Sequence, residues 1–376
     1  MNRLKNLFLL LAGVVMLASC SMMETDRSGC PGGVYVKFVY DYNVQRADMR
    51  KDHVGGITVY VFDESDRLVM RRDVENEGDR APLRSYDYAM HFNPGELPAG
   101  RYRLVAVAQQ KGYEAALATP GAKFRRTDLQ PGDARDGLRI RLDRGTAADI
   151  PDAIAGTPDG DGEARPVSAE APLDTLWTGT TVNPDRTADE QGEAYIEVRD
   201  ELPTYATVYL VRDTKHIHVE MRQLEEPADI SDTDFAVTVT AGNGLLDGDN
   251  TLLDDEKLVY SPYHAWTLDS EGGYRMAHYD LNCSRLTFDD ERAAGNARLR
   301  IYDKKNRRDV VVADLPRWLI EGRITPEYRY GAQEYLDRQY DYRIEVVLRG
   351  ATWHEVYIHV QLNMLNWAKR IQNVDL

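Results

Sequence analysis

Two groups of side chains in this sequence have the chemistry of metal ligands. His216 and His218 alternate along a predicted strand, so both imidazoles share one face and could hold a metal ion. Alternating polar residues on a solvent-facing strand explain the pair equally well. Acidic residues crowd the loop 247–256, but Thr251 and Leu252 stand where a calcium loop needs oxygen ligands and glycine. We interpret the loop as an acidic, solvated turn, and the sequence predicts no metal site.

Motifs of catalysis are missing from the sequence. It contains no G-x-x-x-x-G-K-S/T phosphate loop, no G-x-S-x-G elbow and no H-E-x-x-H zinc helix. Gly242, Gly244 and Gly248 have the wrong spacing for a dinucleotide-binding fingerprint. With 62 acidic residues, pairs of carboxylates arise by chance. The sequence therefore predicts a protein that is not an enzyme and needs no cofactor.

Cys20 is the residue whose sequence context most clearly indicates a chemical role, that of a lipid attachment site. A basic start with Arg3 and Lys5 precedes an apolar run over residues 7–18, which rises only about 18 Å as a helix and is too short to cross a bilayer. The following residues, Leu-Ala-Ser-Cys at 17–20, match the bacterial lipoprotein processing site, where the cysteine accepts a diacylglyceryl thioether. We expect residues 1–19 to be a lipoprotein signal peptide and Cys20 to carry the lipid. The alternative is a plain signal peptide that is cut near Ala18.

Lipidation would fix the compartment of the protein. Lipoproteins of this kind usually carry three acyl chains, which makes attachment effectively permanent, whereas one chain binds only marginally. No other stretch is apolar enough to span a bilayer, so we expect a soluble body tethered outside the cytoplasm. The net charge of −16 becomes −18 once Arg3 and Lys5 are removed, which argues against a nucleic-acid partner.

Two further cysteines remain after lipidation. Cys30 and Cys283 would lie in an oxidising compartment and are a candidate disulfide pair. The alternatives are two isolated thiols or a thiol linked to a partner, because sequence alone cannot bring two Cα atoms within about 7 Å.

Period-two alternation of apolar residues recurs along the chain and predicts an all-β protein. Val34, Val36 and Phe38 share one face of the first strand, and a turn at 63–66 ends the second. One short helix is expected over 314–321, with Pro316 in its first turn. The other strands are expected at 57–61, 102–106, 206–212, 217–221, 235–240, 299–302, 342–348 and 356–362.

The length of 376 residues suggests two domains. We predict a lipidated tether over 20–33, an N-terminal β-sandwich over 34–226 and a C-terminal β-sandwich over 227–376. The acidic, proline-containing segment 146–172 lacks aromatic residues and is predicted to be a mobile insert of the first domain.

Several segments resemble one family. They are 30–43 (CPGGVYVKFVYDYN), 57–64 (ITVYVFDE), 97–106 (LPAGRYRLVA), 176–179 (LWTG) and 367–376 (WAKRIQNVDL). Together they are similar to the FimB-type anchoring lipoproteins of Bacteroidia-type fimbriae, especially the minor-fimbrium anchor subunits. The acidic insert 146–172 is longer than that pattern leads us to expect.

The resemblance implies two tandem transthyretin-like β-sandwich domains. It also implies a surface-exposed outer-membrane lipoprotein with diacylglycerol and an N-acyl chain on Cys20. Such a protein anchors a fimbrium, limits its length, and contributes to adhesion and biofilm formation. The implied partners are the shaft pilin and accessory fimbrial subunits, joined by strand addition through 356–376 or an edge of the first domain.

Two alternative functions stay open at this point. A shaft or tip pilin of the same fold would lose its lipid and first strand by cleavage after an arginine, and Arg46 lies just beyond the first strand. Cleavage at Arg27 would free the protein without opening a groove. A surface glycan-binding lipoprotein would stack sugars on exposed aromatics such as Trp266 and Trp353.

Overall fold

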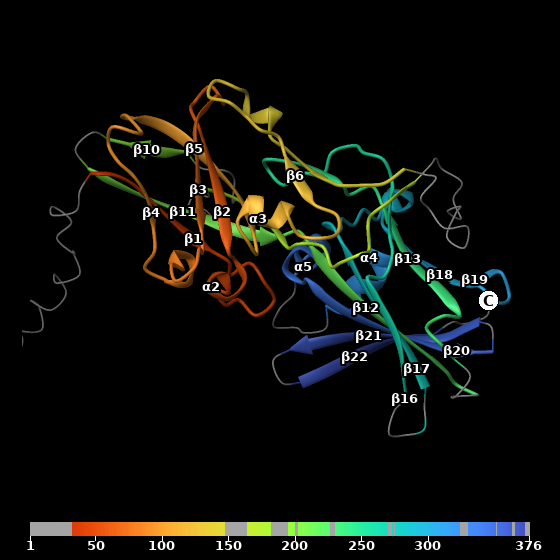
Figure 1. Cartoon of the computed structure of the whole chain (residues 1–376). Coiled ribbons are helices and arrows are strands. Elements are labelled where there is room, and N and C mark those ends of the chain that lie inside the picture. Colours follow the sequence, from red (N-terminus) through yellow and green to blue (C-terminus); the bar gives the residue numbers. More distant parts are fainter. Residues whose placement is uncertain are drawn as a thin grey trace, which may run out of the picture.

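The structure is a computed structural model whose regular elements are mainly β-strands, with a few short helices (Figure 1). It describes residues 32–146, 164–181, 195–199, 202–225, 230–269, 273, 275–323, 330–350, 352–362 and 365–372. The strands are β1 (Gly33–Val39), β2 (Gly56–Phe62), β3 (Leu68–Glu75), β4 (Met90–Phe92), β5 (Gly100–Gln109), β6 (Phe124–Arg126), β7 (Arg139–Leu142), β8 (Arg165–Pro166), β9 (Leu176–Thr181), β10 (Ile196–Val198), β11 (Pro203–Arg212), β12 (Lys215–Gln223), β13 (Phe235–Ala241), β14 (Leu245–Asp247), β15 (Leu258–Tyr260), β16 (His264–Asp269), β17 (Arg275–Cys283), β18 (Arg298–Asp303), β19 (Arg308–Asp314), β20 (Asp341–Arg349), β21 (Thr352–Leu362) and β22 (Leu365–Gln372). The helices are α2 (Arg50–His53), α3 (Tyr113–Leu117), α4 (Leu315–Ile320) and α5 (Ala332–Arg338), with 3-10 turns η1 (Pro82–Arg84), η2 (Arg135–Gly137) and η5 (Ala293–Gly295).

These strands form four sheets. The N-terminal half holds an eight-stranded sheet in the order β3-β2-β5-β9-β11-β1-β4, with β10 paired to β5. The C-terminal half holds a six-stranded sheet, β16-β17-β12-β20-β21-β22, and a five-stranded sheet, β19-β18-β13-β15-β8. A small sheet, β14-β7-β6, joins strands of both halves. The prediction of an all-β protein with two β-sandwiches is confirmed.

Local sequence accounts for the elements that were predicted. Val34, Val36 and Phe38 of β1 are buried while Lys37 is exposed, which is the alternation of a strand with one core-facing side. α4 begins where Asp314 caps it, since its carboxylate accepts a hydrogen bond from the Arg317 N–H at 2.9 Å. Pro316 sits in the first turn, as expected, because that turn needs no N–H donor from it.

One hydrophobic core runs through both halves. It combines Val219 of β12 and Val237 of β13 with Val105 of β5 and Ile140 of β7. A second cluster, including Val36 and Val208, fills the other face of the eight-stranded sheet. The halves are therefore interlocked rather than joined by a free linker.

The sheets divide at a different point from the predicted boundary at residues 226 and 227. β11 belongs to the eight-stranded sheet and β12 to the six-stranded sheet, and only Asp213 and Thr214 separate them. β12 falls within the range 34–226 predicted for the first domain, but its partners β17 and β20 come from the C-terminal half.

The predicted mobile insert is partly ordered. Residues 147–163 lie outside the described part of the chain, but β8 pairs with β15 and its neighbours Ala164 and Val167 are buried. Arg165 N–H and Val167 N–H each donate to a carbonyl of the segment 257–259, at 2.8 and 2.9 Å. The end of the insert is therefore an edge strand of the five-stranded sheet, not a mobile loop.

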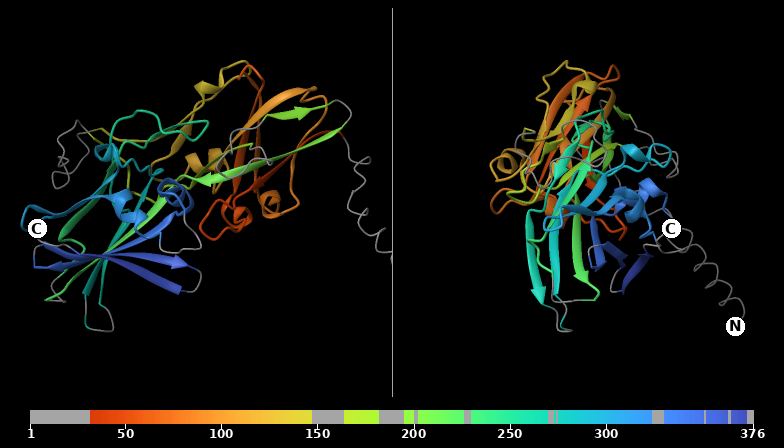
Figure 2. Two further views of the ribbon diagram at one scale, coloured as in Figure 1. Left: turned by 180° about the vertical axis from the view of Figure 1, so that it is seen from behind. Right: turned by 90° about the vertical axis from the view of Figure 1, so that its right-hand side faces the viewer.

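The long axis of the molecule follows β11 into β12. The two strands and the two residues between them cover about 70 Å of extended chain. β1, β4 and β10 lie at one end of this axis, and the six-stranded sheet occupies the other end (Figures 1 and 2). In the part of the chain that the structure describes, no helix has the length and apolar composition needed to cross a membrane.

Candidate functional site: the domain junction and the free sheet edges

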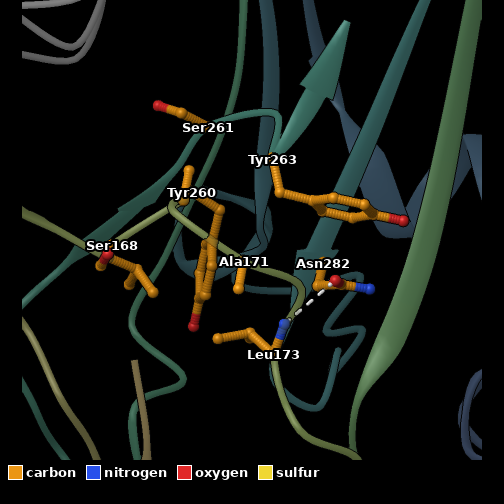
Figure 3. Close-up of a pocket in the computed structure, with 9 residues that line it drawn as sticks. Ser168, Ala171, Leu173, Tyr260, Ser261, Tyr263 and Asn282 are labelled. Carbon is orange, nitrogen blue, oxygen red and sulfur yellow. Dashed lines mark hydrogen bonds between the residues drawn. The ribbon is translucent and has the colours of Figure 1, made fainter. Parts of the chain in front are cut away.

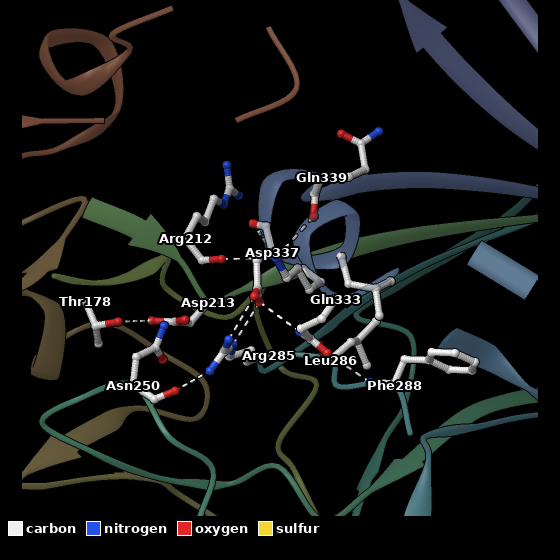
Figure 4. A network of polar contacts seen from close by, with 12 residues as sticks. Thr178, Arg212, Asp213, Asn250, Arg285, Leu286, Phe288, Gln333, Asp337 and Gln339 are labelled. Carbon is white, nitrogen blue, oxygen red and sulfur yellow. Dashed lines mark hydrogen bonds and ion pairs between the residues drawn. The ribbon is translucent and has the colours of Figure 1, made fainter. Parts of the chain in front are cut away.

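Buried charges gather where β11 passes into β12 (Figure 4). Lys215 and Asp213 are both completely buried. The Lys215 ammonium donates to the backbone carbonyls of Arg212, Asp337 and Gln339 at 3.1, 3.2 and 3.1 Å. Three carbonyls replace the water that a lysine ordinarily holds, so the cation ties the end of β11 to the last turn of α5 and to Gln339 just after it.

The carboxylates of this network come from both halves of the chain. Asp213 accepts a hydrogen bond from the Thr178 hydroxyl of β9 at 2.9 Å. Arg285 binds Asp337 through two hydrogen bonds, at 2.9 and 2.8 Å, and also donates to the Asn250 carbonyl. The network therefore links β9 and β11 of the first half to the 285 loop and α5 of the second half.

Burial perturbs the ionisation of these groups. It raises the pKa of Asp213 to about 6, against the opposing effect of Arg285 and Lys215. It also lowers the pKa of Lys215 to about 8, although Asp337 and Asp213 favour the charged form. In both cases the pKa shifts in the direction that favours the neutral form, so the loss of solvation on burial outweighs the attraction between the opposite charges.

Arginine–tyrosine contacts extend the junction toward the surface. The Arg212 guanidinium lies 3.9 Å from the centre of the Tyr340 ring, and Arg338 lies 3.9 Å from that of Tyr42. Arg46 donates to the Tyr330 hydroxyl at 2.9 Å. These pairs dock the segment after β1 onto the residues around α5, so the two halves are held by packed side chains as well as by the chain itself.

The loop that contains Arg46 is closed on itself. Asn43 is fully buried, and its side-chain amide donates to the carbonyls of Tyr40 and Ala47 at 3.1 and 2.8 Å. The Arg46 N–H donates to the Asn43 carbonyl at 3.1 Å, and Arg46 has a φ of 51°. A closed turn of this kind differs from the extended chain that proteases bind. Arg27, the other arginine considered for cleavage, lies outside the described residues.

The predicted histidine pair lies on the outer face of the six-stranded sheet. His218 sits between Asp280 of β17 and Asp341 of β20, with its two ring nitrogens 2.6 and 3.0 Å from their carboxylates. Hydrogen bonds to Asp341 and Asp280 raise the pKa of His218 to about 9, whereas burial and Arg212 lower the pKa of His216 to about 4. A doubly hydrogen-bonded imidazolium has no lone pair for a metal. The described residues contain no cluster of three potential metal ligands.

The acidic loop is a turn bound by arginines. Asp247 accepts hydrogen bonds from the N–H groups of Asp249 and Thr251, both at 2.9 Å. Asp255 pairs with Arg144 at 2.6 Å, and Asp249 pairs with Arg135. Because both arginines follow or precede β7, these pairs also help to fasten the small sheet to the C-terminal half.

Of the three cysteines, the described structure includes Cys283. Cys283 is a free, fully buried thiol, and burial raises its pKa to about 12. Cys20 and Cys30 lie outside the described residues. The candidate bond between Cys30 and Cys283 stays a prediction, because only Cys283 lies in the described part of the chain.

The tryptophans considered for glycan stacking are already packed. Trp353 lies against the main core with its ring 5.8 Å from that of Trp318. Trp266 stacks with His264 at 4.5 Å and with His278 at 4.8 Å. Both indole rings are therefore already in contact with other side chains at the surfaces on which a sugar ring would stack.

A small pocket lies between the end of the acidic segment, β15 and β17 (Figure 3). The Leu173 N–H donates to the Asn282 side-chain oxygen at 3.2 Å across its floor. Its lining holds serine and tyrosine hydroxyls but no carboxylate, imidazole or amine, so no such base lies beside the Ser168 or Ser261 hydroxyl to activate it. The lining consists of Val167, Ser168, Ala169, Ala171, Leu173, Tyr260, Ser261, Tyr263 and Asn282.

Sheet edges and the first strand are the features suited to subunit assembly. β22 and β16 are the edges of the six-stranded sheet, and β3 and β4 are those of the eight-stranded sheet. β22 pairs with β21 from Leu362↔Leu365 to Glu355↔Gln372 and leaves its other side without a strand in the described chain. β1 lies inside its sheet, parallel to β11 and antiparallel to β4.

Comparison with known proteins gives one family and a consistent fold. A family model described as fimbrillin-A associated anchor proteins Mfa1 and Mfa2 matches residues 27–373. No curated protein sequence matches the chain. Among solved structures, a Bacteroides thetaiotaomicron protein described as a candidate polysaccharide-binding protein is 24% identical, with a TM-score of 0.66 over 91% of this chain and 98% of the other.

Two further structures share the fold. A candidate adhesin from Bacteroides thetaiotaomicron is 22% identical, with a TM-score of 0.65 over 88% of this chain and 96% of the other. The fimbrial anchor protein Mfa2 from Porphyromonas gingivalis is 16% identical, with a TM-score of 0.54 over 88% of this chain and 97% of the other.

Proposed function

The chain belongs to the family of fimbrillin-A associated anchor proteins, and from that premise we propose that it roots a fimbrium in the outer membrane through a lipid on Cys20. Family membership makes it a fimbria-associated cell-surface protein. The proposed role is structural and non-enzymatic. Its partners are a shaft pilin and accessory fimbrial subunits, and through the fimbrium it contributes to adhesion and biofilm formation.

The position of β1 is the observation that carries the proposal. β1 is paired on both sides, and its Val34, Val36 and Phe38 are buried in the core of the sheet. A shaft pilin would have to lose this strand to open a groove for a neighbour. The closed loop around Arg46 and its bond to Tyr330 keep the strand in place. A protein that keeps its first strand opens no groove for a neighbour's strand, and unless it is cut between Cys20 and Gly33 it also keeps the lipid.

The location of the tether supports a base position in the fimbrium. The tether enters the fold at Gly33, beside the start of β11, and the six-stranded sheet lies at the far end of the β11–β12 axis (Figure 2). The domain junction links these two ends through buried side chains. We propose that the edge strand β22 meets the shaft pilin by strand addition, which would also hide its unpaired backbone groups.

This arrangement would limit fimbrial length. A subunit that offers one strand edge and remains lipidated can join the polymer only at its base. No pilin could add beyond it, because the opposite end is occupied by the membrane. Growth would stop once the anchor has joined.

The experiment compares three strains. Deletion of the gene should give fimbriae that are longer than those of the parent and are shed into the medium. Complementation with a Cys20→Ala variant should leave the protein out of the outer-membrane fraction and fail to restore attachment, whereas Cys30→Ala, the matched control in the tether, should restore it. Fimbriae of normal length and attachment in the deletion strain would show that the protein is not the anchor.

A further inference from the structure

One face of the eight-stranded sheet is only half covered. Tyr60 of β2, Val105 of β5, Thr180 of β9, Tyr209 of β11 and Val39 of β1 are successive partners across the sheet, so they point to the same side. Over β2 and β5 this side is buried against strands β6 and β7 of the small sheet. Over β11 and β1 no other sheet of the described chain packs on this side, and Tyr209 is 36% exposed.

The open half carries ordered aromatic rings. His91 of β4 stacks on Tyr35 of β1 at 4.3 Å, and Tyr35 stacks on Tyr205 of β11 at 5.4 Å. Tyr205 is 45% exposed. We call this surface the tyrosine face. Its outward residues are Tyr35, Lys37, Val39, His91, Tyr205, Thr207 and Tyr209.

The charge of this face differs from that of the rest of the protein. The chain has 62 acidic residues and a net charge of −16, yet these seven outward positions include no carboxylate and one exposed lysine, Lys37. Glu197 of β10, on the same side of the sheet, is paired with Arg199 at 3.3 Å. A surface whose nearby carboxylate is paired can approach an anionic layer with little like-charge repulsion. Tyrosine suits the boundary of a bilayer, because its ring is apolar and its hydroxyl remains hydrated.

The face also lies where the tether enters the fold. Gly33 opens β1, and the preceding carbonyl, that of Gly32, lies 3.2 Å from the His91 ring nitrogen. Thirteen residues from Cys20 to Gly33 reach at most about 45 Å, whereas β1 is only about 23 Å long. A lipid on Cys20 therefore holds the whole tyrosine face within reach of the bilayer surface.

We propose that the tyrosine face rests on the membrane surface as a second attachment beside the lipid. This inference rests on the proposed lipid anchoring. The tyrosine hydroxyls lie at the level of the lipid headgroups, and Lys37 meets anionic phosphates. A single flexible tether lets a protein swivel, whereas a tether and a face together fix its orientation. The base of the fimbrium then has a defined direction relative to the membrane.

Site-directed spin labelling of the full lipidated chain tests this contact. Thr207→Cys places a label between Tyr205 and Tyr209, and Leu268→Cys is the control on the far sheet, where Leu268 is 56% exposed. Both variants carry Cys30→Ser, while Cys283 is buried and does not label. The accessibility of each label to a water-soluble nickel chelate is measured on vesicles of phosphatidylethanolamine and phosphatidylglycerol. The same variants with Cys20→Ala, in buffer, give the baseline.

Vesicle binding should lower nickel accessibility at position 207 by at least about three-fold and leave position 268 unchanged. Adding Tyr205→Asp and Tyr209→Asp should remove that protection while circular dichroism confirms the fold. Protein that floats with vesicles but stays accessible at 207 overturns the tyrosine-face contact and leaves the anchor proposal intact. Protein that does not float overturns both. Protection that appears in buffer and grows with protein concentration assigns the face to a second copy and also overturns the membrane contact.

Discussion

Two charge networks share strand β12 but lie on its opposite faces. Lys215 points inward, has no exposed surface and is held by three carbonyls. His218, three residues later, points outward with a third of its side chain exposed and is held by two carboxylates. Burial lowers the pKa of Lys215 to about 8, whereas hydrogen bonds with Asp341 raise the pKa of His218 to about 9.

The opposite shifts separate the roles of the two networks. For Lys215 the desolvation of the charge outweighs the attraction of its partners. Removing one member of this buried network therefore leaves other polar groups uncompensated and lowers the free energy of unfolding strongly. For His218 the attraction of its partners dominates, and solvent screening keeps its contribution small. The inner network joins the two halves of the molecule. The outer network links side chains of neighbouring strands on the solvent-facing side of the six-stranded sheet.

The largest effect is expected from Lys215→Met, measured in the soluble Cys20→Ala protein. The substitution removes the ammonium donor from three buried carbonyls, of which that of Gln339 keeps the Tyr342 hydroxyl as a donor at 3.0 Å. It also removes a countercharge of Asp213 and Asp337, so the free energy of unfolding should fall by about 3–5 kcal/mol. Urea unfolding followed by circular dichroism measures it. Lys37→Met, at an exposed strand position, is the control and should change the value by less than about 0.5 kcal/mol. Equal losses in both variants would contradict the importance of the buried network.

The thiol beside Lys215 gives a second measure of burial. Cys283 pairs with Lys215 across β12 and β17, and burial raises its pKa to about 12 from an ordinary value of 9.0. At pH 8 the folded protein should hold roughly 10³-fold less Cys283 thiolate than the unfolded one. In a Cys20→Ala, Cys30→Ser protein, reaction with a thiol reagent should therefore be at least about 100-fold slower without urea than with it. Rapid reaction of the folded protein would mean that the strand pair opens readily.

The inner network was missed in the sequence, although a signal for it exists. Lys215 has the same strand parity as Ile217 and Val219, so the alternation places a lysine on the core-facing side. A charge in such a register indicates a buried polar network. Its partners Asp337 and Arg285 are far away in sequence, and no local pattern connects them to β12.

The elements were predicted unequally for a similar reason. β1, β2, β5 and α4 follow from alternation, turn residues and a capping aspartate, all of which are local. Strands β6, β7, β8 and β14 are only two to four residues long, and pairing with distant strands defines them. The sheet boundary at 213–214 was misplaced because β12 continues the direction of β11 while changing partners.

A smaller, pH-dependent effect is expected from the outer network. The pKa of His218 is raised from 6.5 to about 9 in the folded protein, so its stabilising contribution is fully present below pH 6.5 and is lost as the pH rises through about 9. His218→Gln removes it. The difference in unfolding free energy between the parent and this variant should fall by about 1 kcal/mol between pH 6 and 9.5, a value reduced for solvent screening. Asp213 and Lys215 titrate in both proteins and cancel. A difference that does not vary with pH would show that Asp280 and Asp341 do not raise the pKa of His218 in the folded protein.

The smallest effect is expected at the exposed end of the same sheet. Arg275 and Asp269 close the β16–β17 hairpin with a 2.9 Å contact, but their side chains are 43% and 74% exposed. Water screens such a pair, and ordering two side chains offsets much of the attraction. A double-mutant cycle of Arg275→Ala and Asp269→Ala, read by urea unfolding, should give a coupling energy below about 0.5 kcal/mol that vanishes in high salt. A coupling near that of the buried network would mean that distance between partners, rather than burial, sets the strength of ion pairs in this protein.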